Sequence, residues 1–346
     1  MRGLPKYHCG DRRGGGAMSG PLFQYGRAAT VHDALIRASK PGAAYLAGGT
    51  DLLQLWKSGA MTPAAVVDIS RLPLDEVELI GGELSLGALA RLSDVASHPD
   101  VIRNHPLIAE AILASASGQI RNMATVGGNL LQRTRCPYFR NEQLACNKRK
   151  PGSGCGALSG ENRQAALFGT SSSCVATHAS DLAVALAALD AEVEVFGSEG
   201  ERRFSLRDLY RPPGETPERE TNLAPGELIT GVHVPNATRF AACSTYLKIR
   251  DRASFEFAVV SVAAALQIEN GKIVQARLAA GGVAPLPWRL DSTEAALVGH
   301  PLNARAIAAA GDLAVEHARP LAQNGFKVAL LRNAMIRALQ TLGRRP

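Results

Sequence analysis

Four of the six cysteines stand close together in a part of the chain that lacks regular periodicity. Residues 130–176 are rich in Cys, Arg, Asn, Gly and Ser, and they contain Cys136, Cys146, Cys155 and Cys174. This segment constrains the fold most. It shows no hydrophobic periodicity that would place it in a helix or a strand, so bonds made by its cysteines are expected to hold it in place. Four thiolates outside regular structure can bind zinc, form two disulfides or hold a [4Fe–4S] cluster.

The spacing of these cysteines separates the three alternatives only in part. Nine, eight and eighteen residues lie between successive members, whereas structural zinc sites usually present close cysteine pairs. Disulfides need an oxidising compartment and are most useful in small domains, and this chain is long enough for a large core. An iron–sulfur cube is wider than a single ion, so a wrapping loop can supply its ligands one at a time. The spacing therefore favours a cluster, with zinc second and disulfides third.

Two glycine turns stand elsewhere in the chain. Residues 47–53 read AGGTDLL, and residues 125–129 read TVGGN. Backbone N–H groups in such turns form an anion-binding nest, and glycine lets a pyrophosphate approach closely. Neither turn has the G-x-G-x-x-G spacing of a Rossmann fold, and each alone is better explained by an ordinary tight turn. The two together, with Asp181 and Lys248 available, favour a bound dinucleotide.

Outside the cysteine segment, short strands and helices alternate. Thr30 and the pair Ser180-Asp181 are expected N-caps, and the Pro- and Glu-rich residues 211–226 are expected to form a surface loop. We expect helices at 31–39, 52–58, 106–120, 182–189, 292–298, 304–318 and 321–342, strands at 43–46, 66–70 and 191–197, and hairpins at Gly81-Gly82 and Asn270-Gly271.

The chain of 346 residues is long enough for two or three domains, and its 46% of hydrophobic residues is typical of a globular protein. The net charge of +7 is spread along the chain, which argues against a nucleic-acid partner. No apolar run reaches the roughly 18 residues of a membrane span. Residues 1–17 are basic and Gly-rich without an apolar stretch, so we expect a disordered leader, or a start placed too far upstream, rather than a secretory signal.

Several of these stretches, in this order, resemble the FAD-binding medium subunits of the xanthine dehydrogenase and carbon monoxide dehydrogenase family. Together they span nearly everything from about residue 20 to residue 340. Several motifs in the right order are far more specific than any one of them. They are AGGTDLL at 47–53, ATVGGNLLQ at 124–132, SDLAVALAALDAEVEV at 180–195, PGELIT at 225–230 and KIRDRASFEFAVVSVAAAL at 248–266.

The resemblance implies an α+β fold, with a two-lobed vanillyl-alcohol-oxidase-like FAD-binding domain and a small α+β C-terminal domain. We expect the FAD-binding domain over residues 18–238, with lobes at 18–75 and 76–238, and the C-terminal domain over 239–346. Asp181 would bind the ribityl or adenosine side of FAD, and Ile229 and Lys248 would lie near the adenine or the ring system. The two glycine turns would hold the pyrophosphate through Ala44, Tyr45, Leu46, Ala47, Gly48, Gly49, Thr50, Asp51, Leu52, Thr125, Gly128 and Asn129.

In most of that family the second glycine turn is soon followed by the Ser-Asp pair, but here Asn129 and Asp181 are 52 positions apart (181 − 129). The insert at 130–176 is similar to that of the flavin subunit of bacterial periplasmic aldehyde oxidoreductases, which carries a [4Fe–4S] cluster. The resemblance implies that the four clustered cysteines bind such a cluster. The flavin subunits of 4-hydroxybenzoyl-CoA reductase and of N-heterocycle hydroxylases are the alternatives within the family, and a zinc-stapled nucleotide-binding module is the alternative outside it.

The resemblance also implies a reaction divided among the subunits of a heterotrimer. An aldehyde would be hydroxylated at a molybdenum cofactor in a large partner subunit. Electrons would pass through [2Fe–2S] clusters in a small partner subunit to the FAD held here, and then to an external acceptor. We expect a periplasmic location, reached by export of the folded complex on a partner's signal, with the cytoplasm as the alternative.

Overall fold

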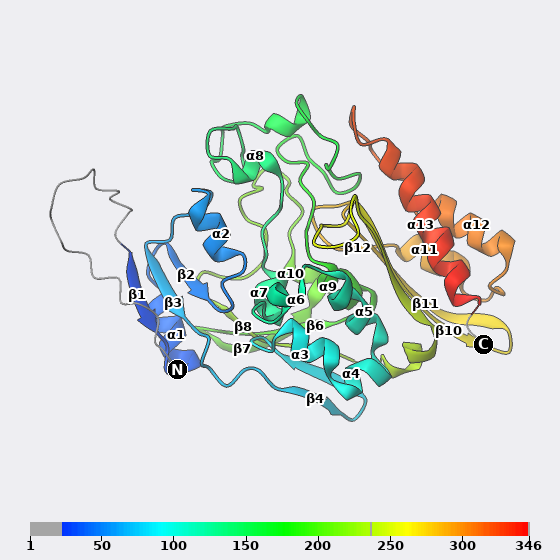
Figure 1. The fold of residues 1–346 in the computed structure, drawn as a ribbon, viewed down its shortest axis with the longest axis horizontal. Helices are drawn as coiled ribbons and strands as arrows, with labels where there is room; N and C mark the ends of the chain where they lie inside the picture. The colour runs from blue at the N-terminus through cyan, green and yellow to red at the C-terminus, as the bar shows by residue number, and fades with distance from the viewer. Residues whose placement is uncertain (1–22, 236, 345–346) are drawn as a thin grey trace.

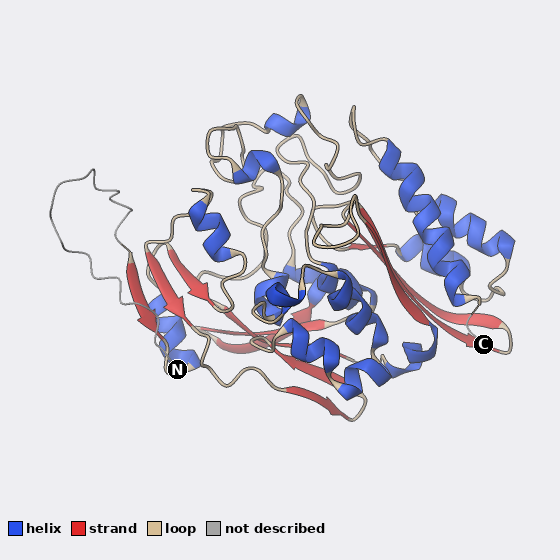
Figure 2. Cartoon of the chain, viewed as in Figure 1, coloured by secondary structure: helices blue, strands red, loops and turns tan. Residues whose placement is uncertain are grey.

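The computed structural model describes residues 23–235 and 237–344, which form an α+β molecule of three sheets with helices packed against them (Figure 1, Figure 2). The α+β prediction is confirmed. The expected leader at 1–17 and the first residues of the expected FAD-binding domain, 18–22, lie outside the described residues. No helix in the described part of the chain is long and apolar enough to cross a membrane.

A small parallel sheet of order β1-β3-β2 forms the N-terminal lobe (Figure 1). Its central strand is buried along its whole length, because it has a neighbour on each side. The first helix begins after Thr30, whose hydroxyl accepts the N–H of Asp33 at 3.0 Å. The elements are β1 (Gln24–Arg27), α1 (Val31–Ala38), β2 (Ala43–Leu46), α2 (Leu52–Lys57) and β3 (Ala65–Asp68).

An antiparallel sheet of order β4-β5-β8-β6-β7 forms the base of the second lobe. Its first hairpin turns at Gly81 and Gly82, both with positive φ, as the sequence predicts. Strand β8 arrives from far along the chain and pairs with both β5 and β6, which joins the two halves of the lobe. The strands are β4 (Val77–Ile80), β5 (Glu83–Gly87), β6 (Glu192–Gly197), β7 (Gly200–Ser205) and β8 (Leu228–Val234).

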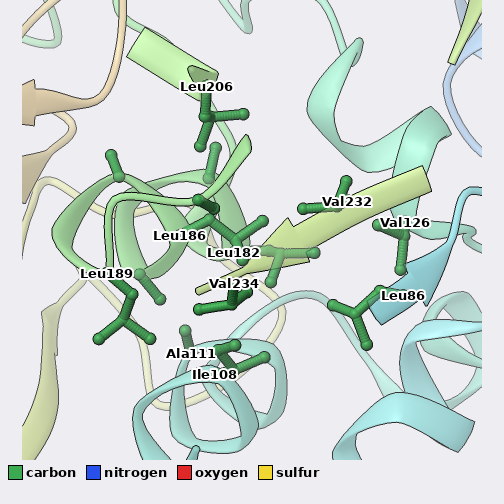
Figure 3. Packing of buried hydrophobic residues seen from close by; sticks show 14 of the residues in the cluster. Leu86, Ile108, Ala111, Val126, Leu182, Leu186, Leu189, Leu206, Val232 and Val234 are labelled. Atoms are coloured by element: carbon green, nitrogen blue, oxygen red, sulfur yellow. The ribbon is translucent and has the colours of Figure 1, made fainter. Parts of the chain in front are cut away.

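Helices pack on one face of this sheet around α9, all of whose residues are buried. Figure 3 shows Leu182 and Leu186 of α9 beside Val232 and Val234 of β8. A helix that is apolar all round is stable only when it is enclosed, and α9 is enclosed by this sheet, α5 and the C-terminal sheet. The helices are α3 (Leu92–Ser97), α4 (Pro99–Asn104), α5 (Pro106–Ala114), α6 (Gly118–Arg121), α7 (Val126–Leu130), α9 (Asp181–Ala188) and α10 (Leu206–Leu209).

The expectation of one helix over 106–120 is wrong. Helix α5 ends at Ala114, because Ser115 adopts an extended conformation and Ala116 has φ of +46°. The Ser115 hydroxyl donates to the carbonyl of Ile112 at 2.7 Å and competes with the helical ladder. Ser117 then caps α6. The break leaves the carbonyl of Ala114 free for side chains from the C-terminal part of the chain.

A four-stranded antiparallel sheet of order β12-β11-β10-β9 forms the C-terminal part. Successive residues of β10 alternate between two cores: Ala263 and Ala265 pack with α9, while Val262 and Ala264 pack with the C-terminal helices. Because both faces are covered, the strand reads as a continuous apolar run. The elements are η2 (Thr238–Cys243), β9 (Ser244–Ile249), β10 (Val260–Glu269), β11 (Lys272–Gly281) and β12 (Trp288–Arg289).

Three helices cover the outer face of this sheet (Figure 1). They are α11 (Asp291–Leu297), α12 (Ala304–Leu313) and α13 (Phe326–Leu342). The expected helix over 321–342 starts five residues late, because Asn324 accepts the N–H of Leu321 and donates to the carbonyls of Ala165 and Ala166. Those bonds hold residues 321–325 in a turn against the insert.

The insert at 130–176 runs as extended loop over the molecule, between α2 and the C-terminal sheet (Figure 1). Its regular structure is limited to α8 (Pro137–Arg140) and η1 (Gly156–Leu158), as the lack of periodicity predicts. Arginine, lysine and asparagine side chains provide most of its described anchoring contacts.

Candidate functional site

The two glycine turns pack directly against each other. Gly49, with φ of +71°, turns the chain from β2 into α2. A β-carbon on Gly48 would lie 1.8 Å from the carbonyl oxygen of Met123, just before the second turn. Only glycine allows this approach. The structure therefore explains why a glycine stands at position 48 and brings the two predicted loops together.

The second turn is the start of helix α7. The hydroxyl of Thr125 accepts the N–H of Gly128 at 3.3 Å and caps the helix. The N–H of Gly127 donates to the carbonyl of Ala88 at 2.8 Å, which fixes the turn to the end of β5. Asn129 accepts the hydroxyl of Ser180 at 2.5 Å and so ties the turn to the start of α9.

Two adjoining cavities run along these turns, with volumes of about 280 and 360 Å³. Both are lined by Thr50, Asp51 and Gly128, so they meet at the turns. All the predicted FAD-binding residues except Leu46 line one or both cavities. The first holds Ala44, Tyr45, Ala47, Gly48, Gly49, Leu52, Thr125 and Ile229, and the second holds Asn129, Asp181 and Lys248. Leu46 lies outside them, and its carbonyl accepts the N–H of Ile69.

Asp181 and Lys248 form a buried ion pair in the wall of the second cavity. The Lys248 ammonium donates to Asp181 Oδ2 at 2.8 Å and to the carbonyl of Ala114 at 3.1 Å. Tyr246, which the sequence analysis missed, donates its hydroxyl to Asp181 Oδ1 at 2.7 Å. Burial raises the pKa of Tyr246 well above its ordinary value, and Asp181 raises it further, so the phenol stays protonated. This cluster joins α9 of the second lobe to β9 of the C-terminal sheet.

Asp51 lies in the first turn but directs its carboxylate toward the insert. Oδ2 accepts the N–H of Arg133 at 2.7 Å, and Oδ1 accepts the guanidinium of Arg140 at 2.9 Å and that of Arg135. Burial alone would raise the pKa of Asp51, but Arg135 and Arg140 outweigh burial and lower it. The carboxylate is thus ionised and engaged by groups 82 to 89 residues away.

The four predicted cysteines of the insert line one small cavity of about 10 Å³. All four are free thiols, and the backbones of Cys146 and Cys155 pair as an isolated antiparallel bridge. Burial raises the pKa of Cys136 to about 11 and also raises that of Cys174, which Lys148 partly offsets. Within residues 23–235 and 237–344, no three His, Cys, Asp or Glu side chains are grouped tightly enough to hold a single metal ion. The four thiols thus line one site without closing on a single ion.

Lys148 supplies a buried positive charge at this cavity. Its ammonium donates to the carbonyl of Pro217 at 3.0 Å and to Glu220 at 2.7 Å. Glu220 also pairs with Arg133. The loop at 211–226 is therefore more than a surface connection, because it holds the middle of the insert.

A third cavity of about 450 Å³ lies between the insert and the C-terminal sheet. Cys136 lines both this cavity and the cysteine cavity, while Arg135, Asp181 and Phe257 line both it and the second cavity. Lys327 stands in its wall with its ammonium on the carbonyls of Gln164, Ala165 and Gly282. The cysteine site and the glycine-turn site are neighbours in one connected system.

Two family models match the chain: the FAD binding domain in molybdopterin dehydrogenase over residues 21–237, and the CO dehydrogenase flavoprotein C-terminal domain over residues 245–342. The chain belongs to the FAD-binding subunits of the molybdenum hydroxylases. The family prediction is confirmed. Like the homologous subunits, the chain is part of an oxidoreductase.

Among its relatives, the chain is 46% identical to the aldehyde oxidoreductase FAD-binding subunit PaoB of Escherichia coli over 320 residues, which cover 92% of this chain and 97% of that protein. It is 29% identical to the glyceraldehyde dehydrogenase medium chain of Sulfolobus acidocaldarius, over 82% of this chain and 83% of that one. The carbon monoxide dehydrogenase structure from Hydrogenophaga pseudoflava superposes with a TM-score of 0.74 at 25% identity, covering 95% of this chain and 99% of that chain.

Proposed function

We propose that this FAD-binding subunit also carries a [4Fe–4S] cluster and transfers electrons within a heterotrimeric molybdenum-dependent aldehyde oxidoreductase. The observation that carries the proposal is the convergence of four insert cysteines on one cavity beside the glycine-turn site. The identity of 46% with an aldehyde oxidoreductase subunit supports the substrate class. The nicotine 6-hydroxylase medium subunit of Paenarthrobacter nicotinovorans is only 24% identical, which favours aldehydes over N-heterocycles.

The two adjoining cavities fit FAD. A dinucleotide needs a diphosphate site between two ring sites, and the packed glycine turns stand where the cavities meet. We place the diphosphate on the backbone of Gly48, Gly49 and Gly128, and the flavin ring in the second cavity, near Asp181 and Lys248. When bound, FAD supplies two-electron and one-electron redox chemistry. The chain's own residues hold the ring, and the buried ion pair keeps its surroundings polar and fixed.

The cysteine cavity fits a cluster better than a zinc ion. Zinc lies about 2.3 Å from each sulfur, so four thiols would have to close on one point. In the described part of the chain the four thiols are not grouped tightly enough to hold one ion, and the residues that line their cavity include no carboxylate or histidine. Cys136, Cys146, Cys155 and Cys174 would bind as thiolates, and the buried ammonium of Lys148 would offset their negative charge.

The third cavity shares Cys136 with the cysteine cavity, and Arg135, Asp181 and Phe257 with the second cavity. This proximity supports an electron-relay role for the cluster. In this proposal a large molybdenum-cofactor subunit oxidises the aldehyde, a small subunit passes the electrons through [2Fe–2S] clusters, and an external acceptor removes them. We propose a periplasmic location, reached by export of the folded complex. A cluster potential far below that of the flavin, with turnover unchanged on cluster reduction, would contradict the relay role.

An absorption spectrum of the purified complex, taken before and after anaerobic addition of an aldehyde, tests the proposal. We expect oxidised flavin bands over broad iron–sulfur absorption, and bleaching of both by the aldehyde. Flavin bands that bleach without iron–sulfur absorption assignable to this chain would remove the cluster. A chain that lacks flavin and contains zinc would remove the whole proposal.

A further inference from the structure

Asp51 has an unusual position for a helix-capping residue. It is the N-cap of α2, yet its side chain makes no capping hydrogen bond to that helix. An aspartate at an N-cap ordinarily accepts a backbone N–H of the first turn. Here both carboxylate oxygens are used by the insert instead, and the side chain is largely buried, with 13% exposed. The residue has exchanged a local stabilising contact for a long-range one.

The groups that bind Asp51 surround the first cysteine ligand. Arg135 directly precedes Cys136, and Arg140 ends the short helix that begins after it. Besides donating to Asp51, Arg140 donates to the carbonyls of Thr134 and Arg133 at 3.0 and 3.2 Å. The residues on both sides of Cys136 therefore bind one carboxylate, that of Asp51, which belongs to the flavin-binding turn.

The other limbs of the insert are held by separate contacts. Lys148 binds the 211–226 loop. Asn162 and Gln323 exchange two hydrogen bonds at 3.0 Å, and Lys327 binds the carbonyls of Gln164 and Ala165. Arg149 also holds the short helix after Cys136, since it donates to the carbonyls of Tyr138 and Phe139 at 2.6 and 2.8 Å. Loss of the Asp51 carboxylate would therefore untie the Cys136 turn from the flavin-binding turn, while the Cys146, Cys155 and Cys174 segments keep their own anchors.

We infer that Asp51 is a positioning residue that fixes the Cys136 corner of the cluster site against the flavin-binding turn. The inference rests on the proposed function, since it needs a cluster on the four cysteines. Asp51 acts through Arg135 and Arg140 and does not touch a cluster ligand itself. Residues that orient a metal ligand from behind typically change metal affinity or activity by about 10- to 100-fold when they are replaced.

The test compares Asp51→Asn with Asp312→Asn in the purified complex. Asp312 is a matched control, because its carboxylate pairs with Arg332 at 2.6 Å on exposed α12 and α13. Each complex is treated with ferricyanide. A [4Fe–4S]²⁺ cluster then gives one electron to ferricyanide, releases one Fe²⁺ and leaves [3Fe–4S]⁺, which is detected by electron paramagnetic resonance in the oxidised sample. FAD content is measured in parallel.

We expect Asp51→Asn to keep FAD and to form the three-iron species about 10- to 100-fold faster than wild type, because the iron on Cys136 is loosened. Asp312→Asn should match wild type. Arg140→Gln, with Arg332→Gln as its control, leaves the flavin turn unaltered and should show the same acceleration if Asp51→Asn folds poorly. Wild-type rates in both Asp51→Asn and Arg140→Gln, or loss of FAD from Asp51→Asn with a stable cluster, would overturn the inference alone. A wild-type complex without a four-iron cluster would overturn the proposed function and this inference together.

Discussion

The buried pair of Asp181 and Lys248 gives a prediction that can be worked out from its contacts. The side chains are 5% and 3% exposed. In Asp181→Asn, the Lys248 ammonium would keep the carbonyl of Ala114 at 3.1 Å and could donate to the new amide oxygen, but it would have no compensating negative charge. Tyr246 would keep the hydroxyl of Ser261 at 2.9 Å as a partner, so the main cost falls on the lysine.

Removal of one partner from a buried ion pair costs about 3–5 kcal/mol in the free energy of unfolding. We expect Asp181→Asn and Lys248→Met each to fall in that range. The double variant Asp181→Asn with Lys248→Met removes both charges, so it should cost at least about 2 kcal/mol less than the sum of the two single variants. The pair joins α9 to β9, and its loss should therefore weaken the contact between the second lobe and the C-terminal sheet.

Urea unfolding of the FAD-loaded protein, followed by circular dichroism and by flavin fluorescence, measures these free energies. Single variants that each lose less than about 1 kcal/mol, with an additive double variant, would refute the reasoning. That result would mean that water or the cofactor, rather than the aspartate, neutralises Lys248.

Two further predictions concern stability at low pH and the packed glycine turns. His105 is 2% exposed, and neither of its ring nitrogens has a hydrogen-bond partner among residues 23–235 and 237–344; burial lowers its pKa to about 4 from 6.5. Between pH 6.5 and about 4, the unfolded chain therefore binds a proton that the folded chain does not. The free energy of unfolding should fall by up to about 3 kcal/mol as the pH falls through that window. His105→Leu should flatten the dependence of the urea midpoint on pH there, and an identical slope in the variant would contradict this. Gly48→Ala should abolish FAD retention, because its β-carbon would meet the Met123 carbonyl. Gly118→Ala is the control: its β-carbon would have no described atom within 4 Å, so this variant should retain FAD in the same flavin assay. Equal FAD content in both variants would show that the turns can separate.

The sequence predicts those parts of the structure that rest on local chemistry. Gly48 allows close approach to the backbone of Met123, and Gly49 allows a positive φ. The run at 181–188 is so apolar that it must be enclosed. The alternation of β10 between two cores follows from its continuous apolar residues. In these places the residue types allow only one kind of local structure.

Contacts across long sequence separations could not be predicted in this way. Nothing local in Asp51 indicates that its carboxylate leaves its own helix for arginines 82 to 89 residues away. Tyr246 looks like an ordinary strand residue until β9 is placed beside α9. The break after Ala114 had a signal in Ser115, Ser117 and Gly118, but hydrophobic periodicity outweighed it.

In the proposed function, this chain binds both FAD and a four-iron cluster on the insert. The most direct measurement is the iron, sulfide and flavin content of the purified complex, with ⁵⁷Fe Mössbauer spectroscopy to separate four-iron from two-iron clusters. Wild type and Cys243→Ala should contain one four-iron cluster per FAD, while Cys146→Ala should lose the four-iron spectrum and keep FAD and the two-iron clusters. A Cys146→Ala complex with an unchanged Mössbauer spectrum, or a wild type with only two-iron clusters, would contradict the account.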